Sequence, residues 1–364
     1  MGGADLVHVT REFCFVPRDL NADKRIGYVD SLKGFAIILV VLGHICAGYN
    51  AAQAYPSAKL ALTAIHRAIY MFHMPLFMTI SGYVFRAAYF TDVGEPRRGR
   101  IFRQALDLLL TCFLFSAMLG CFKMVAAGYV NSVMSPRDIL LIPVRPVSPY
   151  WYLYVLAIFY FTFSAGMARL CRMRTAILLP MTVFLSAWGS WIGTNMPFEL
   201  GRSLFYSFFF ALGIALRRHG WDVLTNSIAT SIFGVCAGVL AAIFWHGCRG
   251  GDAIPLVNLA LGTMFTFFFW GVFSQIQFFA GNRVLRFVGR NSLEIYLLHC
   301  IFTAGNRTVL SRLGVGNAFV GTSLNLIISV LLPMLFGIAC KRLGVHGFLF
   351  KPVSWLCHKH SVSS

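Results

Sequence analysis

The sequence predicts an all-α protein, a polytopic transmembrane helical bundle of about ten spans. Three observations predict it: 58% of the 364 residues are hydrophobic, only 12% are charged, and the apolar residues come in long blocks. A soluble chain would carry roughly twice that share of charge to cover its surface. Each block is long enough to cross a hydrocarbon core of about 30 Å as a helix.

Helices are expected for all ten spans, because a helix satisfies its own backbone hydrogen bonds where lipid cannot. The sixth span is short, and the polar run GNRT interrupts the ninth. Residues 1–25 are expected to form a cytoplasmic N-terminal tail, residues 26–342 the membrane domain and residues 343–364 a cytoplasmic C-terminal tail. The expected spans, in chain order, are 31–49, 64–89, 105–128, 150–168, 175–194, 202–217, 225–246, 254–277, 291–311 and 320–340.

The positive charge is distributed as a membrane topology requires. The formal net charge is +18, yet Lys and Arg form short clusters between apolar blocks. Nucleic-acid binders carry a basic stripe instead, so no nucleic-acid partner is expected. With both termini inside, the inside segments hold more than twice as many Lys and Arg as the outside segments, which predicts an N-in/C-in topology. The ten cysteines lack metal-ligand spacing, so no metal site is expected.

The first span, KGFAIILVVLGHICAGYN, begins with Lys33 and carries His44 eleven residues later. An ionisable side chain inside lipid is costly and therefore a candidate for function. Eleven residues make about three helical turns plus roughly 20°, so the two side chains share a face about 16 Å apart. Lys33 could equally extend to the interface. His44 could bond a neighbouring helix, but a buried imidazole favours a general base.

The second span places His73 two residues before Pro75 in the run FHMPLF. Pro75 predicts a kink in the helix, because it lacks a backbone N–H. Ser81 and Gly82, later in the span, allow a second helix to approach closely. His73 is then either a hydrogen-bonded residue at a structural kink or a second polar group of an active site.

The run EPRRGRIFRQ, between the second and third spans, holds two overlapping RxxR spacings, Arg97/Arg100 and Arg100/Arg103. Arginines are expected here from the topology alone. At the start of a helix, Arg100 and Arg103 also share a face. Guanidinium groups match phosphate oxygens, so the same residues could form a phosphate clamp.

Two later stretches carry further polar candidates. Tyr150 and Trp151, in SPYWYLYVL, fit an aromatic belt at the outer interface, or a platform for a sugar. Glu294 and His299 lie inside the ninth span, in VGRNSLEIYLLHCIF. They are five residues apart and do not share a helix face closely. Because a carboxylate inside a membrane is costly, a functional role for Glu294 is favoured over a purely structural hydrogen bond.

Together these stretches resemble the acyltransferase 3 family of polytopic membrane acyltransferases, in order through essentially all of residues 25–340. The form with Lys-Gly and FHMPLF looks most like sugar O-acetylases, including fucose 4-O-acetylase-like proteins. The resemblance implies that residues 26–342 are an acyltransferase domain in the inner (cytoplasmic) membrane of a bacterium. It implies acyl-CoA, most simply acetyl-CoA, as the cytosolic donor, and a hydroxyl of a surface polysaccharide or glycolipid as the acceptor. No metal is expected.

The resemblance also implies roles for residues. Lys33 and His44 fill the family's basic-x10-His motif, with Lys in place of the commoner Arg. Arg100 and Arg103 fill an RxxR motif that the family links to acyl-CoA binding. His44 is expected to act as the general base, or as a nucleophile that carries the acyl group, with His73 as a second catalytic residue. The residues expected to bind substrate are Tyr150, Trp151, Glu294 and His299.

A different class of protein would share many of these features. A transporter or flippase that moves a glycan or lipid without modifying it also has broken spans and intramembrane polar residues. Consumption of acyl-CoA distinguishes the two classes.

Overall fold

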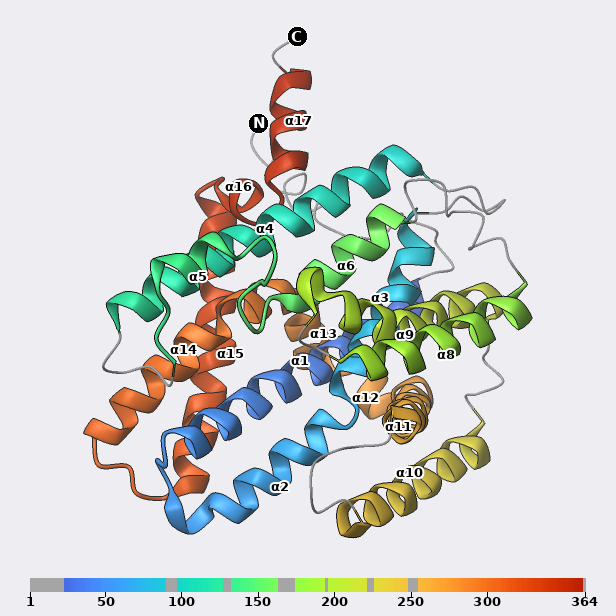
Figure 1. Ribbon diagram of the computed structural model, residues 1–364, viewed down its shortest axis with the longest axis horizontal. Helices are drawn as coiled ribbons and strands as arrows, with labels where there is room; N and C mark the ends of the chain where they lie inside the picture. The colour runs from blue at the N-terminus through green and yellow to red at the C-terminus, as the bar shows by residue number, and fades with distance from the viewer. Residues whose placement is uncertain are drawn as a thin grey trace, which may run out of the picture.

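A computed structural model describes residues 23–89, 97–126, 132–162, 174–193, 196–220, 226–247 and 255–362. Within these ranges every regular element is a helix, which confirms the all-α class (Figure 1). Parts of several expectations concern residues outside this description: most of the N-terminal tail, at residues 1–22, the end of the C-terminal tail, at residues 363–364, and the ends of five spans, at residues 127–128, 163–168, 194, 225 and 254.

A helix lies over every expected span. The helices over the spans are α1 (Asp23–Ala51), α2 (Lys59–Tyr70) with α3 (His73–Tyr89), α4 (Arg98–Val125), α6 (Trp151–Thr162), α8 (Thr175–Ile192), α9 (Leu200–His219), α10 (Ser227–Gly247), α11 (Pro255–Gln275), α14 (Ser292–Arg312) and α15 (Ala318–Arg342). The shorter helices are η1 (Pro56–Ala58), α5 (Pro136–Leu140), η3 (Pro197–Glu199), α12 (Gln277–Ala280), α13 (Arg283–Arg290), α16 (His346–Phe350) and α17 (Pro352–Val362).

Eight segments of the described chain are long and apolar enough to cross a membrane, which makes this a multi-pass membrane protein. Among the described residues, α6 is also apolar, but it is shorter than a membrane span. α14 has the length of a span, and the run GNRT does not interrupt it. Its charged and polar residues lower its hydropathy below that of the eight. The number ten and the N-in/C-in orientation therefore stay predictions.

α1 lies at the centre of the bundle (Figure 1) and packs against α2, α11, α13, α14 and α15. Its buried face is apolar, and the side chains of Leu32, Ile37, Val41 and Ile45 are almost completely buried. In lipid, apolar burial does not by itself hold helices together. Close packing and polar contacts between the helices are therefore needed. α1 is thus positioned to carry side chains into the interior of the bundle.

α3 and α9 cross so closely that only glycine fits at the contact. A Cβ atom on Gly82 would lie 2.0 Å from the carbonyl oxygen of Phe210, and one on Gly213 would lie 2.0 Å from that of Thr79. Small residues at such crossings let two backbones approach and gain van der Waals contact. The close approach expected at Ser81 and Gly82 is confirmed, and the Ser81 hydroxyl also bonds the Tyr152 hydroxyl at 2.6 Å.

The second expected span is two helices rather than one kinked helix. α2 ends at Tyr70, residues 71 and 72 form a turn, and α3 begins at His73. Pro75 explains the break, because its ring would clash with the carbonyl of Met71, four residues earlier, and it has no N–H to bond it. The break places His73 on the first turn of α3, directly opposite the last turn of α2.

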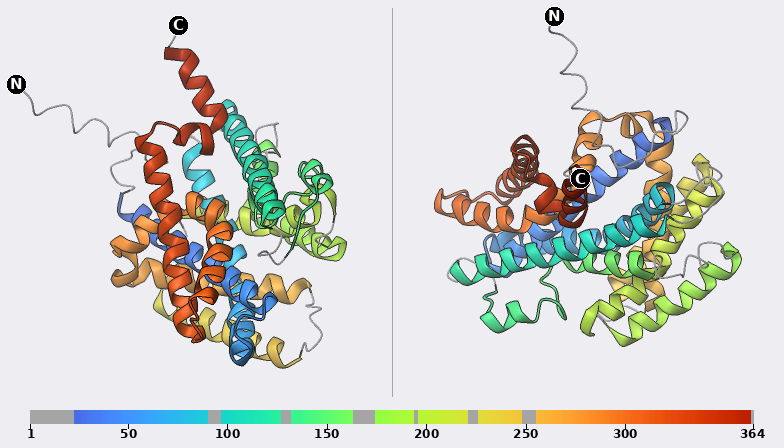
Figure 2. Two further views of the ribbon diagram at one scale, coloured as in Figure 1. Left: turned by 90° about the vertical axis from the view of Figure 1, so that its left-hand side faces the viewer. Right: turned by 90° about the horizontal axis from the view of Figure 1, so that it is seen from above.

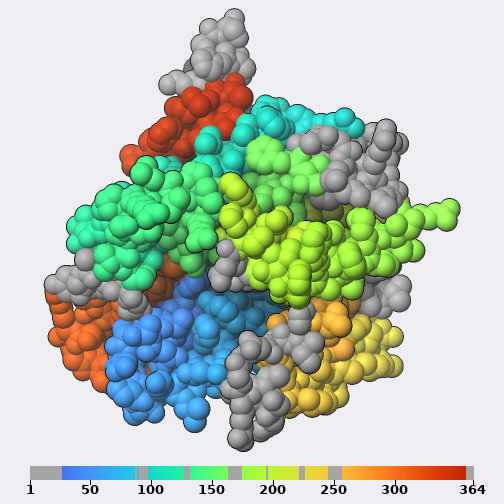
Figure 3. Space-filling model, in the orientation of Figure 1, coloured from blue at the N-terminus to red at the C-terminus, as the bar shows by residue number. Residues whose placement is uncertain are grey.

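α10 shows the side of the bundle that faces lipid. It lies at the lower right of the space-filling view (Figure 3) and is the least buried of the eight span segments. Five of its apolar residues recur at helical spacing and are more than half exposed: Ile228, Ile232, Val235, Val239 and Ile243. Such a stripe is stable only against hydrocarbon or another apolar surface.

The C-terminal segment from residue 343 contains two helices, of which α17 extends away from the bundle (Figures 1 and 2). Asp107 of α4 fixes the start of α17. Its Oδ1 accepts the backbone N–H groups of Val353 at 2.8 Å and Ser354 at 3.2 Å, and its Oδ2 accepts the Ser354 hydroxyl. These are the N–H groups that a helix start leaves without partners. Composition alone had indicated only a tail here.

Candidate active site

The polar centre of the bundle lies where α1 meets α14. The rings of His44, on α1, and His299, on α14, are 5.0 Å apart between centroids. His299 is fully buried and His44 partly buried. The sequence analysis selected both residues, and the structure brings them together although 255 positions separate them along the chain.

The hydrogen bonds of His299 fix its neutral tautomer. Its Nδ1 lies 2.7 Å from the carbonyl oxygen of Tyr296 and 3.1 Å from that of Ile295. A carbonyl only accepts, so Nδ1 carries the proton and Nε2 of the neutral ring keeps a lone pair. That Nε2 lies 3.4 Å from Sγ of Cys300. His299 is thus oriented by its own helix to accept a proton at Nε2.

The junction of α2 and α3 adds three more rings to the centre. Tyr70 lies at its middle, with its ring centroid 4.0 Å from that of His66, 4.6 Å from that of His73 and 6.4 Å from that of His44. The buried His73 places its Nδ1 2.9 Å from the carbonyl oxygen of Ile69. Four imidazoles and a phenol therefore form one connected series of rings, from His66 and His73 through Tyr70 and His44 to His299. Imidazoles are the side chains best suited to move protons near neutral pH.

One group in this centre has the composition of a metal site. The ligand atoms of His44, His299 and Cys300 all lie within 4.8 Å of one another. Nitrogen and thiolate ligands suit zinc, and a ligating His commonly donates its second N–H to a carbonyl, as His299 does to Tyr296. The same three side chains are also a nucleophile and two bases, which is the composition of an acyl-transfer site.

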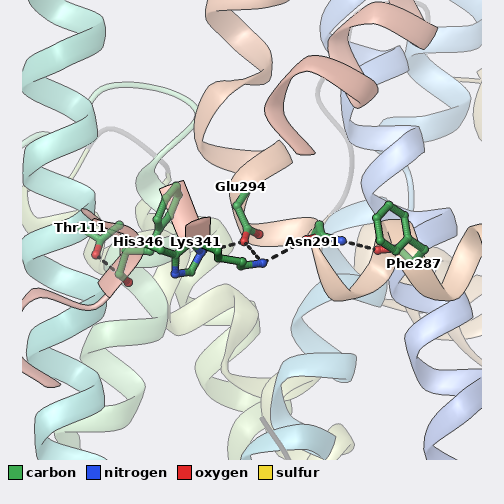
Figure 4. Close-up of polar contacts among 7 residues, drawn as sticks. Thr111, Phe287, Asn291, Glu294, Lys341 and His346 are labelled. Atoms are coloured by element: carbon green, nitrogen blue, oxygen red, sulfur yellow. Dashed lines mark hydrogen bonds and ion pairs between the residues drawn. The ribbon is translucent and has the colours of Figure 1, made fainter. Parts of the chain in front are cut away.

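A second polar cluster lies nearer the start of α14, at the end predicted to be cytoplasmic. Oε1 of the buried Glu294 lies 3.0 Å from Nζ of Lys341 and 2.9 Å from Nε2 of His346 (Figure 4). Lys341 also donates to Asn291 at 3.2 Å. The carboxylate thus links α14, α15 and α16. Its proposed role in binding substrate stays a prediction.

Lys33 belongs to the same end of the bundle. The carboxylates that act on its charge are Asp30 and Glu294. Asp30 in turn accepts from Nε of Arg290 at 3.1 Å. α1 and α14 therefore run together with charged residues at one end and the two histidines further along, the order that the spacing of Lys33 and His44 predicts.

Arg100 and Arg103 lie on the first turns of α4, and both are exposed. The Arg100 guanidinium carbon is 5.7 Å from the centroid of the Tyr89 ring, and Nε of Arg103 is 3.5 Å from the carbonyl oxygen of Gly99. The start of a helix adds a partial positive charge and outward-facing N–H groups to these cations. The role of this surface in binding the phosphate groups of acyl-CoA stays a prediction. The surface is separate from the histidine centre.

Tyr150 and Trp151, neighbours in sequence, have different surroundings. The hydroxyl of the fully buried Tyr150 donates to the carbonyl of Leu297 at 2.6 Å, and the Tyr296 hydroxyl donates to the Pro149 carbonyl. Both bonds fasten the start of α6 to α14. Because its hydrogen is engaged, Tyr150 stabilises an oxyanion only if that bond opens. Its role in substrate binding remains a prediction.

Trp151 lies beside α9, half-buried. Its ring stacks on Tyr206, with centroids 5.3 Å apart and planes at 25°. The guanidinium carbon of Arg202 is 5.0 Å from its centroid, and Arg202 pairs with Glu199 at 2.5 Å. An aromatic ring beside a charged pair is a suitable surface for a polyol.

Sequence reasoning missed several residues of the centre. His66 and Tyr70, which were not selected, lie seven and three residues before the selected His73; these spacings place side chains on one helix face, and this signal was available. Cys300 directly follows His299, and consecutive side chains on a helix point in different directions. Only the structure shows that its sulfur reaches the His299 ring.

The fold and the centre define a class: a multi-pass membrane protein with a partly buried group of histidines and a cysteine suited to group transfer. Residues 26–340 match the sequence profile of the acyltransferase 3 family, an acyltransferase domain, and the chain belongs to that family. No solved structure matches the chain.

Two curated relatives carry the name nodulation protein NolL. The one from Sinorhizobium fredii is 33% identical over 168 residues, covering 44% of this chain and 41% of the relative. The one from Mesorhizobium japonicum is 30% identical over 133 residues, covering 34% of this chain and 31% of the relative. The matches thus span less than half the length of either relative.

Proposed function

We propose that this protein is an integral membrane O-acyltransferase of the bacterial cytoplasmic membrane. It moves an acetyl group from cytosolic acetyl-CoA to a hydroxyl of a surface polysaccharide or glycolipid sugar. Membership of an acyltransferase family supports the reaction class, and the bacterial origin of both relatives supports the location. The observation that carries the proposal is the pair of neighbouring imidazoles between α1 and α14, the partly buried His44 and the fully buried His299.

The donor binds at the end predicted to be cytoplasmic. Coenzyme A carries phosphate groups, and the exposed guanidinium groups of Arg100 and Arg103 on the first turns of α4 suit them. Lys33, near the same end, adds a point charge inside the bundle. The thioester then reaches the histidine centre along the shared face of Lys33 and His44, a length of roughly 16 Å.

The chemical step uses His44 as a general base. Its neutral ring accepts the proton of the sugar hydroxyl as that oxygen attacks the thioester carbonyl, and the coenzyme A thiolate leaves with the proton. Base catalysis of this kind contributes about 10²–10⁴-fold. His73 and the neighbouring Tyr70 lie close enough to orient the acceptor or to pass the proton on. The acceptor enters past Trp151 and Arg202.

The test follows acyl transfer directly. Membranes containing the protein are supplied with isotope-labelled acetyl-CoA and with glycan from cells that lack the gene, and acetylated glycan is measured by mass spectrometry. His44→Ala is expected to abolish transfer at a normal protein level. His219→Ala is the control, because His219 lies at the end of α9 and bonds Thr175, outside the centre. Wild-type transfer by His44→Ala would refute the base, and movement of unmodified glycan without loss of acetyl-CoA would indicate a flippase.

A further inference from the structure

Cys300 is placed as a nucleophile, although a general-base mechanism does not use it. Its Sγ lies 3.4 Å from Nε2 of His299. Because Nδ1 of His299 already donates to the Tyr296 carbonyl, Nε2 accepts, and the thiol is the donor. Of the cysteines within the described ranges, Cys300 is the one whose sulfur bonds an imidazole.

We propose that Cys300 is an acyl carrier: it takes the acyl group from acyl-CoA as a thioester and passes it to the acceptor hydroxyl that His44 activates. This inference rests on the proposed acyltransferase function and adds a covalent intermediate to it. A nucleophile beside a base that a third group orients is the general pattern of covalent catalysis. Here Cys300, His299 and the Tyr296 carbonyl fill those positions in order.

The first half-reaction is a thioester exchange. The Cys300 sulfur attacks the acyl carbonyl of acyl-CoA as its proton passes to Nε2 of His299. The tetrahedral intermediate then collapses, the carbon–sulfur bond to coenzyme A breaks, and His299 returns the proton to the departing thiolate. One thioester is lost and one is formed. Proton transfer accompanies attack, since burial disfavours a separated thiolate and imidazolium.

The second half-reaction releases the acyl group to the acceptor. The ligand atoms of His44 and Cys300 lie within 4.8 Å of each other, a gap that an acceptor hydroxyl can bridge. His44 takes the hydroxyl proton as the oxygen attacks the Cys300 thioester. The ester forms, the carbon–sulfur bond breaks, and the proton passes to the Cys300 sulfur. The enzyme is then ready for another donor.

The surrounding structure holds this turn of α14 in place. The Tyr150 hydroxyl donates to Leu297, and the Tyr296 hydroxyl donates to Pro149, so two bonds anchor the residues just before His299 and Cys300. A fixed nucleophile loses little freedom on reaction, which is the advantage of positioning. A relay also separates the two substrates in time, so a donor from one side and an acceptor from the other need not occupy the centre together.

The test is acylation of the full-length wild-type protein in the absence of acceptor. Protein in lipid nanodiscs is mixed with isotope-labelled acetyl-CoA and quenched in acid, and peptides are examined by mass spectrometry. About one acetyl group per protein is expected on Cys300, removable by neutral hydroxylamine, with an equal amount of free coenzyme A. His44→Ala is expected to form this thioester and to fail in transferring it.

Substitutions separate the relay from the base. Cys300→Ala is expected to lose the label on residue 300 and to retain less than about one hundredth of the wild-type glycan transfer. Cys300→Ser keeps the shape of the side chain, so the same loss of thioester in this variant would not be due to misfolding. Cys340→Ala changes a buried cysteine of α15 and is expected to keep both the acetyl label on Cys300 and the glycan transfer. Wild-type transfer by Cys300→Ala, with His44→Ala inactive, would overturn the relay and leave the base intact. A wild-type protein that never consumes acetyl-CoA would overturn the proposed function and the relay together.

Discussion

Removing the carboxylate of Glu294 should loosen the end of the bundle that is predicted to be cytoplasmic. Oε1 of Glu294 accepts from Lys341 at 3.0 Å and from His346 at 2.9 Å, joining α14 to α15 and α16 (Figure 4). In Glu294→Ala both bonds disappear, and the buried His346 loses its bond to a carboxylate. The expected effect is a lower free energy of unfolding.

The size of the expected loss in free energy of unfolding depends on how exposed the His346 and Lys341 side chains are. A hydrogen bond to a charged group contributes about 1.5–3 kcal/mol when it is buried. The His346 side chain is 11% exposed, so its bond keeps about 2 kcal/mol of this. The Lys341 side chain is 32% exposed, and solvent reduces its share to about 0.5 kcal/mol. The sum is about 2.5 kcal/mol, or roughly 3 °C in the unfolding midpoint of a chain of 364 residues.

The assay is thermal unfolding of the purified protein in detergent, followed by tryptophan fluorescence. Glu294→Gln keeps the size of the side chain and one acceptor oxygen, so its unfolding midpoint should fall less than that of Glu294→Ala. Arg342→Ala, an exposed cation next to Lys341 on α15, should leave the midpoint unchanged. A midpoint for Glu294→Ala within about 1 °C of the wild type would refute the reasoning.

Three further predictions concern other parts of the molecule. Replacing Arg100 and Arg103 together by Gln should raise the KM for acetyl-CoA about tenfold or more in the transfer assay, since each charge-assisted phosphate contact is worth about 1.5 kcal/mol, whereas the exposed Arg137→Gln should not. Gly213→Val should prevent stable folding, measured as yield in size-exclusion chromatography, because its Cβ would lie 2.0 Å from the Thr79 carbonyl. Asn325→Leu should lower the unfolding midpoint by a few degrees, because it breaks bonds to Tyr49 and Thr303 and removes the acceptor of the buried Ser329 hydroxyl.

The fold class followed from composition because lipid permits so few structures. Long apolar blocks had to be helices, and each expected span has a helix over it. The break between α2 and α3 was predicted only as a kink. Pro75 indicates that the helix is disturbed, but whether it bends or separates depends on the packing of α9 and α11 around it.

The candidate site could be predicted in part. Spacing placed Lys33 and His44 on one face, and intramembrane position selected His299. That His44 and His299 meet is tertiary information, since no local pattern indicates which helices are neighbours. Cys300 was missed for the same reason: a cysteine in an apolar run usually packs as a small hydrophobe. Its sulfur gains significance only beside the His299 ring.

The most direct test of the account uses His44→Gln in oriented vesicles. Acetyl-CoA is supplied on the face that carries Arg100 and Arg103, the glycan acceptor on the other, and acetylated glycan is measured over time. The account predicts transfer across the membrane by the wild-type protein and a loss of about 10²-fold or more in His44→Gln, at equal folded protein. Equal rates for the two proteins would contradict it.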